Sequence, residues 1–390
     1  MRQALGAERA GEDDVAALSE LFPRVAIVHE WLTVPGGSEK VVLRLLELFP
    51  RAELFTSIYD PAPWPRAITS RPVHTSFLNR APGAKRNHRR LLPLMNTAFE
   101  SFDLDGFDLV ISSSHSCAKN VITGPDTLHV CYCHTPMRHA WDPRFLDGER
   151  LDPFTRRALP LLLARLRRED LASSLRPDQY VANSTAVAAR IAKYYRRDAR
   201  IIHPPVQVDS LLTTPRAAAD YYLVLGRIVP YKRVDVAVAA CRRLGVPLTV
   251  AGAGRALESV RALAGEAKGI ELLGEVDDAE LSGLFAGARA LLLPGEEDFG
   301  IVPVEAQAAG VPVIAYGAGG ARDTVIDGET GILYRDPSVD GLCAAIRRFA
   351  DHSFDEATVR NSARRFAPER FLREFAAFLT GPGTVRCSLS

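Results

Sequence analysis

Apolar residues along the chain gather in short runs, and most of these runs are followed by a stretch in which apolar positions recur at helical spacing. In the first half, such runs cover residues 24–32, 52–59, 107–114, 128–134, 179–184 and 199–209. In the second half they cover residues 221–228, 248–254, 270–276, 290–295 and 312–317. Regular alternation of a buried strand and a helix is typical of a parallel, right-handed, doubly wound sheet.

The helical stretches are clearest in the second half, where they cover residues 234–244, 257–264, 278–288 and 302–309. A chain of 390 residues exceeds one comfortable hydrophobic core, so two α/β domains are expected. We place them at residues 23–210 and 218–366, and we interpret the Pro204-Pro205 pair with the polar segment that follows it to Asp220 as the linker region. Residues 1–22 carry acidic side chains where a signal peptide has its apolar core, and we interpret them as an N-terminal arm, either an appended helix or a loose segment.

The most informative stretch is LLLPGEEDFGIVPVEAQAAGVPVIAYG, residues 291–317. It predicts a strand, a loop that carries Glu297, and a helix that carries Glu305 one turn inside its start. Backbone amides near Gly300 and Ile301 then face whatever lies before the helix, and a helix N-terminus favours an anion such as phosphate. Two carboxylates beside an anion site suit the hydroxyls of a phosphorylated sugar. Two solvated surface glutamates are the plainer alternative.

Two further segments suggest an anion site. Arg227 and Lys232 flank a turn between a strand and a helix, which suits a diphosphate. Gly36 and Gly37 follow the first strand and allow a tight turn before a helix. The dinucleotide fingerprint G-x-G-x-x-G is absent there, which disfavours an NAD-dependent dehydrogenase.

His134 ends a predicted strand in VCYCHTP, which places it at the carboxyl edge of the first sheet. Cys131, Cys133 and His134 could form a metal fragment, but alternate strand residues point to opposite faces and no second ligand cluster follows. We therefore expect two packed thiols, a separately used histidine and no metal. All six cysteines are expected to be reduced.

The net charge and the hydropathy of the chain limit the kinds of partner that the protein is expected to bind. The formal net charge of +1 disfavours a general nucleic-acid binder, and no apolar run approaches the length of a membrane-spanning helix. These features favour a cytoplasmic protein. Lys85, Arg86, Arg89 and Arg90 precede a predicted helix whose apolar face includes Leu92, Met95 and Phe99. This pattern fits peripheral binding to an anionic membrane surface, and equally an ordinary helix with a solvated basic end.

The motif GEEDFGIVPVEAQAAGVPVIA resembles the E-x(7)-E signature of family 4 retaining glycosyltransferases, with Glu297 and Glu305 as its glutamates. The resemblance extends from about Arg24 to Leu379 and is strongest to bacterial enzymes that transfer mannose from GDP-mannose in polysaccharide assembly. It implies the GT-B fold, two Rossmann-like domains facing a cleft, with a final helix, residues 368–380, that returns to the first domain.

The resemblance also implies roles for individual residues. Arg227 and Lys232 would neutralise the leaving diphosphate, Glu305 would hold the ribose and Glu297 the donor sugar. His134, in the H-T-P motif, would contact the transferred sugar. The positions expected to border the nucleotide are Gly36, Gly37, Val276, Phe299, Gly300 and Ile301.

The reaction implied is transfer of a hexose from a nucleotide sugar to a hydroxyl of a saccharide or polyprenyl-linked acceptor, with retention of configuration and without a metal or other cofactor. Two alternatives stay open. One is a sugar-nucleotide epimerase of the same fold, and the other is a non-catalytic subunit that binds a sugar nucleotide or a polysaccharide.

Overall fold

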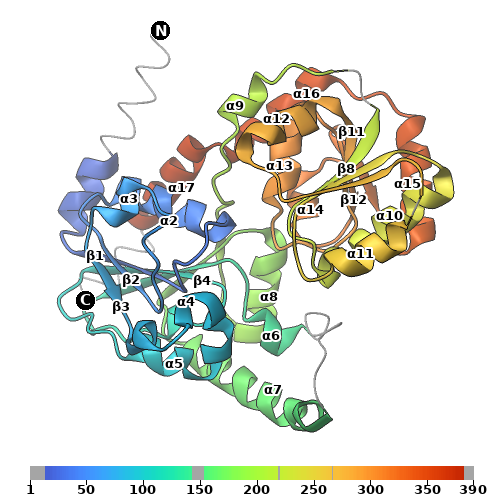
Figure 1. The fold of residues 1–390 in the computed structure, drawn as a ribbon. Coiled ribbons are helices and arrows are strands. Elements are labelled where there is room, and N and C mark those ends of the chain that lie inside the picture. The colour runs from blue at the N-terminus through green and yellow to red at the C-terminus, as the bar shows by residue number, and fades with distance from the viewer. Residues whose placement is uncertain (1–13, 143–152, 218–219, 266, 382–390) are drawn as a thin grey trace. The chain divides into compact units, whose positions relative to one another are not determined.

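The computed structural model describes residues 14–142, 153–217, 220–265 and 267–381, which form two compact units. Within these residues, the first unit contains residues 14–142, 153–205 and 368–381, and the second contains residues 206–217, 220–265 and 267–367. Each unit is built around its own parallel sheet (Figure 1).

The first unit contains a seven-stranded parallel sheet with the order β3-β2-β1-β4-β5-β6-β7. Its strands are β1 (Val25–His29), β2 (Glu53–Thr56), β3 (Val73–Thr75), β4 (Leu109–Ser114), β5 (Leu128–Cys133), β6 (Gln179–Ala182) and β7 (Arg200–Ile201). Its α-helices are α2 (Gly37–Leu48), α3 (Arg66–Thr69), α4 (Ala84–Asn87), α5 (Leu92–Glu100), α6 (Arg138–Trp141), α7 (Pro153–Ser173), α8 (Thr185–Tyr195) and α17 (Pro368–Thr380). Short 3₁₀ turns are η1 (Phe77–Arg80), η2 (His88–Leu91) and η3 (Ala118–Asn120).

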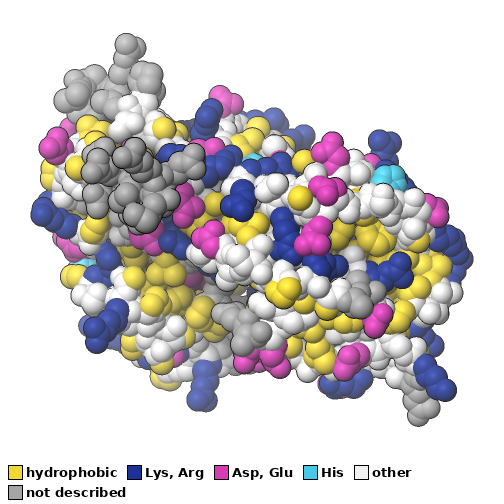
Figure 2. Space-filling model, turned by 90° about the horizontal axis from the view of Figure 1, so that it is seen from above, with side chains coloured by type: hydrophobic (Ala, Val, Ile, Leu, Met, Phe, Trp, Pro, Cys, Tyr) yellow, Lys and Arg dark blue, Asp and Glu magenta, His cyan; other side chains and the backbone are white. Residues whose placement is uncertain are grey.

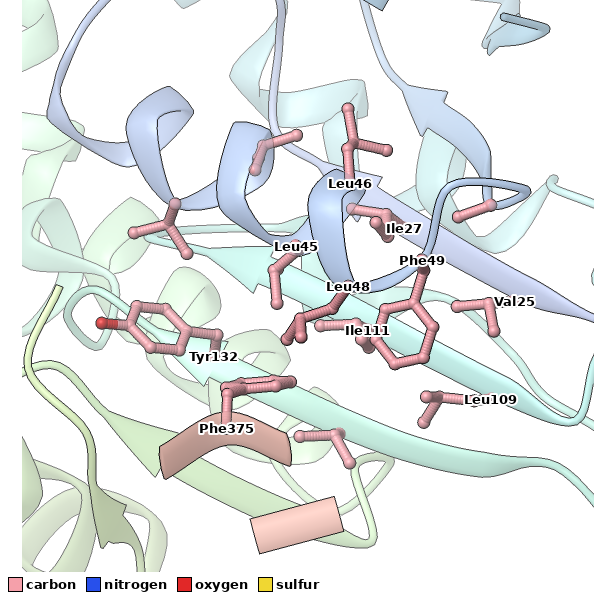
Figure 3. Packing of buried hydrophobic residues seen from close by; sticks show 14 of the residues in the cluster. Val25, Ile27, Leu45, Leu46, Leu48, Phe49, Leu109, Ile111, Tyr132 and Phe375 are labelled. Carbon is pink, nitrogen blue, oxygen red and sulfur yellow. The ribbon is translucent and has the colours of Figure 1, made fainter. Parts of the chain in front are cut away.

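Alternation of side chains along the central strands gives the first unit two apolar layers. On one face Ile27 and Ile111 pack against α2 and against Phe375 of α17 (Figure 3). On the other face Val28 and Val110 pack with the side chains of α5. The C-terminal helix α17 therefore completes the core of the unit that contains the N-terminal strand.

Residues 14–21 of the predicted N-terminal arm are helical, and Leu18 and Phe22 are buried in the core beneath α2. Residues 1–13 lie outside the described residues. The part of the arm that is described is thus a packed element, since its apolar positions join the core.

The second unit contains a six-stranded parallel sheet with the order β10-β9-β8-β11-β12-β13. Its strands are β8 (Tyr221–Leu225), β9 (Leu248–Ala251), β10 (Ile270–Gly274), β11 (Ala288–Leu293), β12 (Val313–Tyr316) and β13 (Gly331–Tyr334). Its α-helices are α9 (Asp209–Leu212), α10 (Val234–Leu244), α11 (Leu257–Ala264), α12 (Asp278–Gly287), α13 (Ile301–Ala308), α14 (Ala321–Thr324), α15 (Val339–Ala350) and α16 (Glu356–Ala363). Short 3₁₀ turns are η5 (Pro230–Lys232) and η6 (Arg364–Phe366).

The expected fold class, two Rossmann-like parallel sheets, is confirmed. The segment predicted as a linker is packed in the structure. Val206 and Val208 are buried in the second unit, and the amide of Val206 donates to the carbonyl of Phe366 at 2.9 Å. The Pro204-Pro205 pair marks the end of one unit, but the residues after it belong to the core of the next.

Candidate functional site

In the second unit, the candidate cation Lys232 lies beside the candidate carboxylate Glu297. Lys232 ends the turn η5 after β8, and Glu297 lies on the loop after β11. Lys232 Nζ is 2.9 Å from Glu297 Oε1, and the two side chains are 19% and 16% exposed. The structure thus joins two residues that the sequence analysis assigned to the same donor.

Glycine at position 295 allows the two loops to meet. A Cβ at Gly295 would lie 2.5 Å from the carbonyl oxygen of Tyr231 and 2.6 Å from Lys232 Cα. A side chain there would push the loop of Glu297 away from the turn of Lys232. The backbone of the loop that carries Glu297 therefore packs directly against the backbone of the turn that carries Lys232.

Two glycines also contact the opposite side of the loop that carries Glu297. The amide of Gly320 donates to the carbonyl of Glu297 at 2.9 Å, and a Cβ at Gly319 would lie 2.1 Å from that same oxygen. The sequence analysis missed Gly295, Gly319 and Gly320. The signal that could have identified them is the clustering of glycine in PGEEDFG and YGAGG.

The helix after the acidic loop is α13, which begins at Ile301 with Gly300 as its N-cap. Gly300 has φ +92°, which favours glycine, and its backbone conformation turns the chain into the helix. Glu305 is half-buried in the helix, one turn from its start. The free amides of the first turn and Glu305 therefore lie on the same short helix, as the sequence predicts.

The structure limits how Phe299, expected to border the nucleotide, could contact a ligand. Its side chain is 3% exposed and packs edge to face against Phe366, with ring centroids 5.3 Å apart. A ring held in the core is not available to a ligand, so only the backbone of Phe299 can take part in binding.

Arg227 and Val276 flank the same edge of the second sheet, after β8 and β10. Arg227 is exposed, and its Nη2 lies 3.4 Å from the Tyr231 hydroxyl. Val276 is half-buried just after Gly274, whose carbonyl accepts a hydrogen bond of 2.5 Å from the amide of Gly252.

In the first unit, His134 directly follows β5 and is fixed at both its backbone and its ring. Its amide donates to the carbonyl of Ser114 at 2.8 Å, and its Nε2 lies 2.8 Å from Ser113 Oγ. The ring also packs edge to face on Tyr132, with centroids 5.1 Å apart. Burial, helped by the positive potential of His115 and His29, lowers the pKa of His134 to about 3. His134 is therefore a neutral imidazole at neutral pH.

Gly36 and Gly37 lie at the start of α2, and Gly36 has a role that the sequence analysis did not predict. Gly36 has φ −157°, an extended conformation open to any residue, so the chain does not need glycine there for a tight turn. A Cβ at Gly36 would instead lie 2.9 Å from Oε2 of Glu39. Glycine makes room for a buried carboxylate.

That carboxylate is bonded to a buried histidine. Glu39 Oε1 lies 3.1 Å from His29 Nε2, and the side chains are 7% and 0% exposed. Burial alone would raise the pKa of Glu39, but the hydrogen bond and charge interaction with His29 bring it down to about 2. Glu39 is ionised at neutral pH.

A second buried carboxylate, Glu30, organises the loop that follows β4. It accepts hydrogen bonds from the amides of His115, Ser116, Cys117 and Ala118 and from the hydroxyl of Ser114. Burial opposes ionisation of Glu30, but His115 and these amides lower its pKa. The sequence analysis missed Glu30, whose only signal is an acidic residue that directly follows a buried strand.

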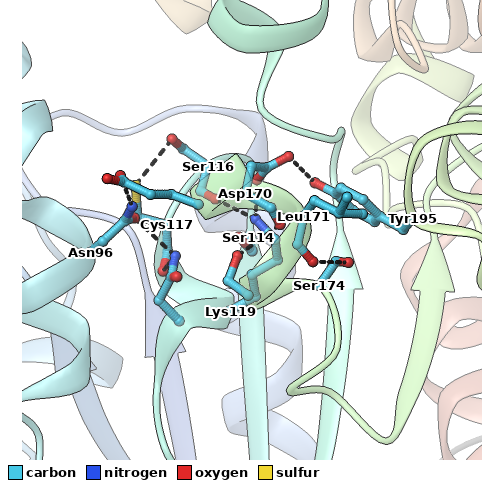
Figure 4. A network of polar contacts seen from close by, with 12 residues as sticks. Asn96, Ser114, Ser116, Cys117, Lys119, Asp170, Leu171, Ser174 and Tyr195 are labelled. Carbon is cyan, nitrogen blue, oxygen red and sulfur yellow. Dashed lines mark hydrogen bonds and ion pairs between the residues drawn. The ribbon is translucent and has the colours of Figure 1, made fainter. Parts of the chain in front are cut away.

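The same loop is anchored by a buried ion pair between Lys119 and Asp170 of α7 (Figure 4). Burial opposes the charge of Lys119, but Asp170 raises its pKa. Asp170 also accepts hydrogen bonds from the Trp141 indole at 2.7 Å and the Tyr195 hydroxyl at 2.8 Å. Trp141 is thereby held against α7 and stacks on Tyr194 with centroids 4.6 Å apart.

The described cysteines are free and buried, and Cys131 and Cys133 lie within β5. Burial raises the pKa of the Cys133 thiol well above its ordinary value. Among the described residues, no group of three His, Cys, Asp or Glu side chains is arranged to hold a metal ion.

The surface carries charges of both signs. On the face shown in Figure 2, Lys and Arg side chains are interspersed with Asp and Glu side chains. Within the basic segment before α5, Lys85 lies 3.4 Å from Asp60. On α7 of the same unit, Leu161 is 77% exposed in a helix that also carries exposed arginines. None of the helices that the structure describes is both long and apolar enough to cross a membrane.

Two protein-family models match the chain. The model described as Glycosyltransferase Family 4 matches residues 35–210, and the model described as Glycosyl transferases group 1 matches residues 215–366. The first match contains His134 and the second contains Arg227, Lys232, Glu297 and Glu305. Together the two matches account for most of the chain.

Among curated proteins, the chain is similar to a D-inositol 3-phosphate glycosyltransferase of Streptomyces avermitilis, with 31% identity over 49% of this chain and 48% of the relative. It is also similar to a glycogen synthase of Mycobacterium tuberculosis, with 35% identity over 41% of this chain and 40% of the relative. The matched region spans about half the length of these curated relatives or less. Neither name specifies mannose, so these relatives do not confirm the mannosyltransferase expectation.

Among solved structures, the fold is similar to that of the lipopolysaccharide outer core galactosyltransferase WaaB, with a TM-score of 0.64 and 17% identity over 91% of this chain and 99% of that one. It is also similar to Anabaena Alr3699/HepE in complex with UDP, with a TM-score of 0.65 and 17% identity over 92% and 99% of the two chains. At this level of identity the likeness concerns the fold.

Proposed function

Since the chain belongs to the family 4 and group 1 glycosyltransferases, we propose that it transfers a hexose from a nucleoside-diphosphate sugar to a hydroxyl group of a saccharide or polyprenyl-linked acceptor. The finer proposal is mannose from GDP-mannose, with retention of configuration at the anomeric carbon. The observation that carries the proposal is the group of Lys232, Glu297 and the start of α13 in the second unit, with Arg227 at the same sheet edge.

The chemistry of that group suits a sugar diphosphate. Lys232 and Arg227 neutralise the diphosphate, and the free amides at the start of α13 add fixed positive potential. Glu305 accepts hydrogen bonds from the ribose hydroxyls, and Glu297 accepts hydrogen bonds from hydroxyls of the transferred sugar. With side-chain cations in this role, the proposed reaction requires no metal.

The bond changes in the proposed reaction involve no protein nucleophile. The bond from the anomeric carbon to the diphosphate oxygen breaks, and a bond to the acceptor oxygen forms on the same face of the sugar. The departing phosphate takes the acceptor proton. Fixed positive groups stabilise the charge that develops on the diphosphate, which is where electrostatic catalysis has its largest effect.

The ion pair between Lys232 and Glu297 adds one step to donor binding. An incoming diphosphate competes with Glu297 for Lys232, and the carboxylate that it displaces becomes available to the sugar hydroxyls. The two side chains keep exposures of 19% and 16%, so an incoming diphosphate can reach the pair.

The direct test is detection of a glycosylated product by mass spectrometry from a panel of sugar nucleotides and saccharide or lipid-linked acceptors. Product from GDP-mannose supports the proposal in full, and product from another donor supports the transferase but not mannose. Interconversion of the sugar nucleotide without an acceptor would favour an epimerase, and binding without turnover would favour a non-catalytic subunit.

We also propose peripheral association of the first unit with an anionic membrane surface. The support is the basic segment before α5, together with Leu161 and the exposed arginines of α7. Basic side chains next to apolar ones bind anionic lipid in a salt-dependent manner. Substituting Lys85, Arg86, Arg89 and Arg90 with serine should release the protein from phosphatidylserine vesicles in a sedimentation assay. Equal sedimentation of this variant and the wild type at low salt would contradict the proposal.

A further inference from the structure

A line of buried polar side chains crosses the first sheet from α2 to His134. Glu39 Oε1 lies 3.1 Å from His29 Nε2, His29 Nδ1 lies 3.1 Å from Ser113 Oγ, and Ser113 Oγ lies 2.8 Å from His134 Nε2. His29 of β1 and Ser113 of β4 are direct neighbours in the parallel register, so their side chains share one face of the sheet. His29, Ser113 and Glu39 are all buried. We call Glu39, His29 and Ser113 the relay.

The relay has a direction because each member has a limited number of protons. An ionised carboxylate only accepts hydrogen bonds, so His29 donates from Nε2 to Glu39. The Glu39 charge is also stabilised by its position in the first turn of α2, where the helix dipole favours an anion. The relay uses His29 with its single imidazole proton on Nε2, which leaves a lone pair at Nδ1.

The remaining two bonds follow from that lone pair. The Ser113 hydroxyl has one proton, which it donates to His29 Nδ1, and its oxygen then accepts from His134 Nε2–H. A neutral His134 with its proton on Nε2 has a lone pair on Nδ1. Within the part of the chain that the structure describes, no hydrogen bond to Nδ1 of His134 is found.

We propose that Glu39, His29 and Ser113 are positioning residues that hold His134 in the Nε2–H tautomer, so that Nδ1 is presented as a hydrogen-bond acceptor to a hydroxyl of the transferred sugar. The inference rests on the proposed function for the identity of that hydroxyl. The tautomer itself is a property of the unliganded protein. Gly36 contributes to the same arrangement, because the absence of a Cβ at this position leaves room for the Glu39 carboxylate.

The protein offers a matched control for this relay. Ser112 precedes Ser113 on β4 and points to the opposite face, where its Oγ lies 2.9 Å from Nε2 of His129. Ser112→Ala therefore removes a buried serine–histidine hydrogen bond of the same kind that has no connection to His134. Ser113→Ala breaks the relay, and Ser113→Thr restores its hydroxyl.

The test is nitrogen NMR of the protein labelled with ¹⁵N-histidine, in which protonated and unprotonated ring nitrogens resonate at well-separated shifts. The chain has nine histidines, and His134→Gln identifies the signals of His134. The wild type, Ser113→Thr and Ser112→Ala should show His134 with a protonated Nε2 and an unprotonated Nδ1. In Ser113→Ala and Glu39→Gln, the shifts of the two His134 ring nitrogens should move toward the average of the two tautomers. The alanine side chain makes no hydrogen bond to His134, and the glutamine amide can either donate to His29 or accept from it.

Turnover provides the second readout. Ser113→Ala should reduce turnover about tenfold, the value of one hydrogen bond, with donor affinity unchanged, and Ser113→Thr should recover it. A wild-type His134 protonated on Nδ1, or a tautomer that stays fixed in both Ser113→Ala and Glu39→Gln, would overturn the inference. If the NMR result holds but no sugar is transferred to any acceptor, the relay stands and the proposed function fails.

Discussion

The two units hold their candidate reactive groups in contrasting ways. In the first unit, His134 is the end of a hydrogen-bonded line whose interior members, His29 and Ser113, are fully buried. In the second unit, Lys232 is paired with Glu297, and both side chains are partly exposed. The contact distances are almost equal, at 2.8 Å and 2.9 Å.

The difference lies in what each arrangement permits. Removing one member of a buried network leaves its partner without a hydrogen bond, which costs about 1–3 kcal/mol, so the network is rigid. The ion pair of the second unit keeps part of both side chains exposed, so a diphosphate can reach it and replace one of its members. We infer that the first unit holds His134 in a fixed orientation before the substrate binds. The second unit instead holds Lys232 in an ion pair from which a diphosphate can displace Glu297.

The largest expected effect is that of replacing His134, the fixed group of the first unit. His134→Ala should reduce turnover on the order of 10²–10³-fold, as for loss of one preorganised polar contact to the reacting sugar. GDP affinity should not change, because His134 is in the first unit and the proposed nucleotide site is in the second. Steady-state kinetics and calorimetry with GDP measure the two effects, with Ser112→Ala as the control. A parallel loss of GDP affinity would show that the proposed division of roles is wrong.

The next prediction separates the two glutamates of the exchangeable group. Glu305→Gln should weaken GDP binding by about 1–3 kcal/mol, the value of a charge-assisted hydrogen bond to the ribose. Glu297→Gln should instead leave GDP binding unchanged or tighten it by up to about fivefold, because Lys232 is released from its ion pair.

The same Glu297→Gln variant should lose turnover, since Glu297 is proposed to contact the sugar. Calorimetry with GDP alone and turnover measurements distinguish the two variants. If Glu297→Gln weakened GDP binding and Glu305→Gln did not, the two roles would be reversed. If neither variant changed binding or turnover, the group would not be the donor site.

The third prediction concerns the effect of acid on the buried layer of the first unit. Burial lowers the pKa of His129 to about 3 from the ordinary value of 6.5, so the unfolded chain binds a proton that the folded chain does not over that interval. The free energy of unfolding should therefore fall as the pH drops below 6.5, by about 2 kcal/mol from this one residue at pH 5.

Urea unfolding of the wild type and of His129→Gln at pH 7 and pH 5 measures this effect. The variant should lose about 2 kcal/mol less than the wild type between the two pH values. The lowered pKa of Glu39 acts only below its ordinary value of 4.5, so the interval from pH 7 to pH 5 isolates the histidines. Equal pH sensitivity of the two proteins would contradict a neutral buried His129.

The smallest expected effect is that of removing divalent metal ions. Dialysis against EDTA should leave turnover unchanged, because Arg227 and Lys232 are proposed to neutralise the diphosphate that a divalent cation would otherwise bind. Assays with and without added Mg²⁺ or Mn²⁺ provide the measurement. Loss of activity that only a divalent ion restores would overturn the metal-independent reaction.

Sequence reasoning predicted most of the second unit because its strands and helices alternate at short intervals. The helices at residues 234–244 and 257–264 have the predicted boundaries. It did not predict β3 or β13. Val73–Thr75 is a short edge strand in a proline-rich stretch, and Gly331–Tyr334 begins with a glycine that lowers strand propensity.

The candidate groups were predicted unevenly for a physical reason. Glu297, Glu305 and Lys232 lie in local motifs, so a short window of sequence identifies them. The relay has no local motif, because His29 and Ser113 become neighbours only through the pairing of β1 with β4. For Phe299, sequence spacing does not show whether the ring points to a ligand or into the core, and in the structure the ring is buried.

The return of α17 to the first unit affects the order in which the chain can fold during synthesis. Residues 206–367 of the second unit leave the ribosome before Phe371 and Phe375, which complete the first core. The first unit, although synthesised earlier, must wait for the end of the chain with an apolar surface beneath α2 uncovered. Nascent chains that stall before residue 368 should therefore contain a folded second unit and an incomplete, aggregation-prone first unit.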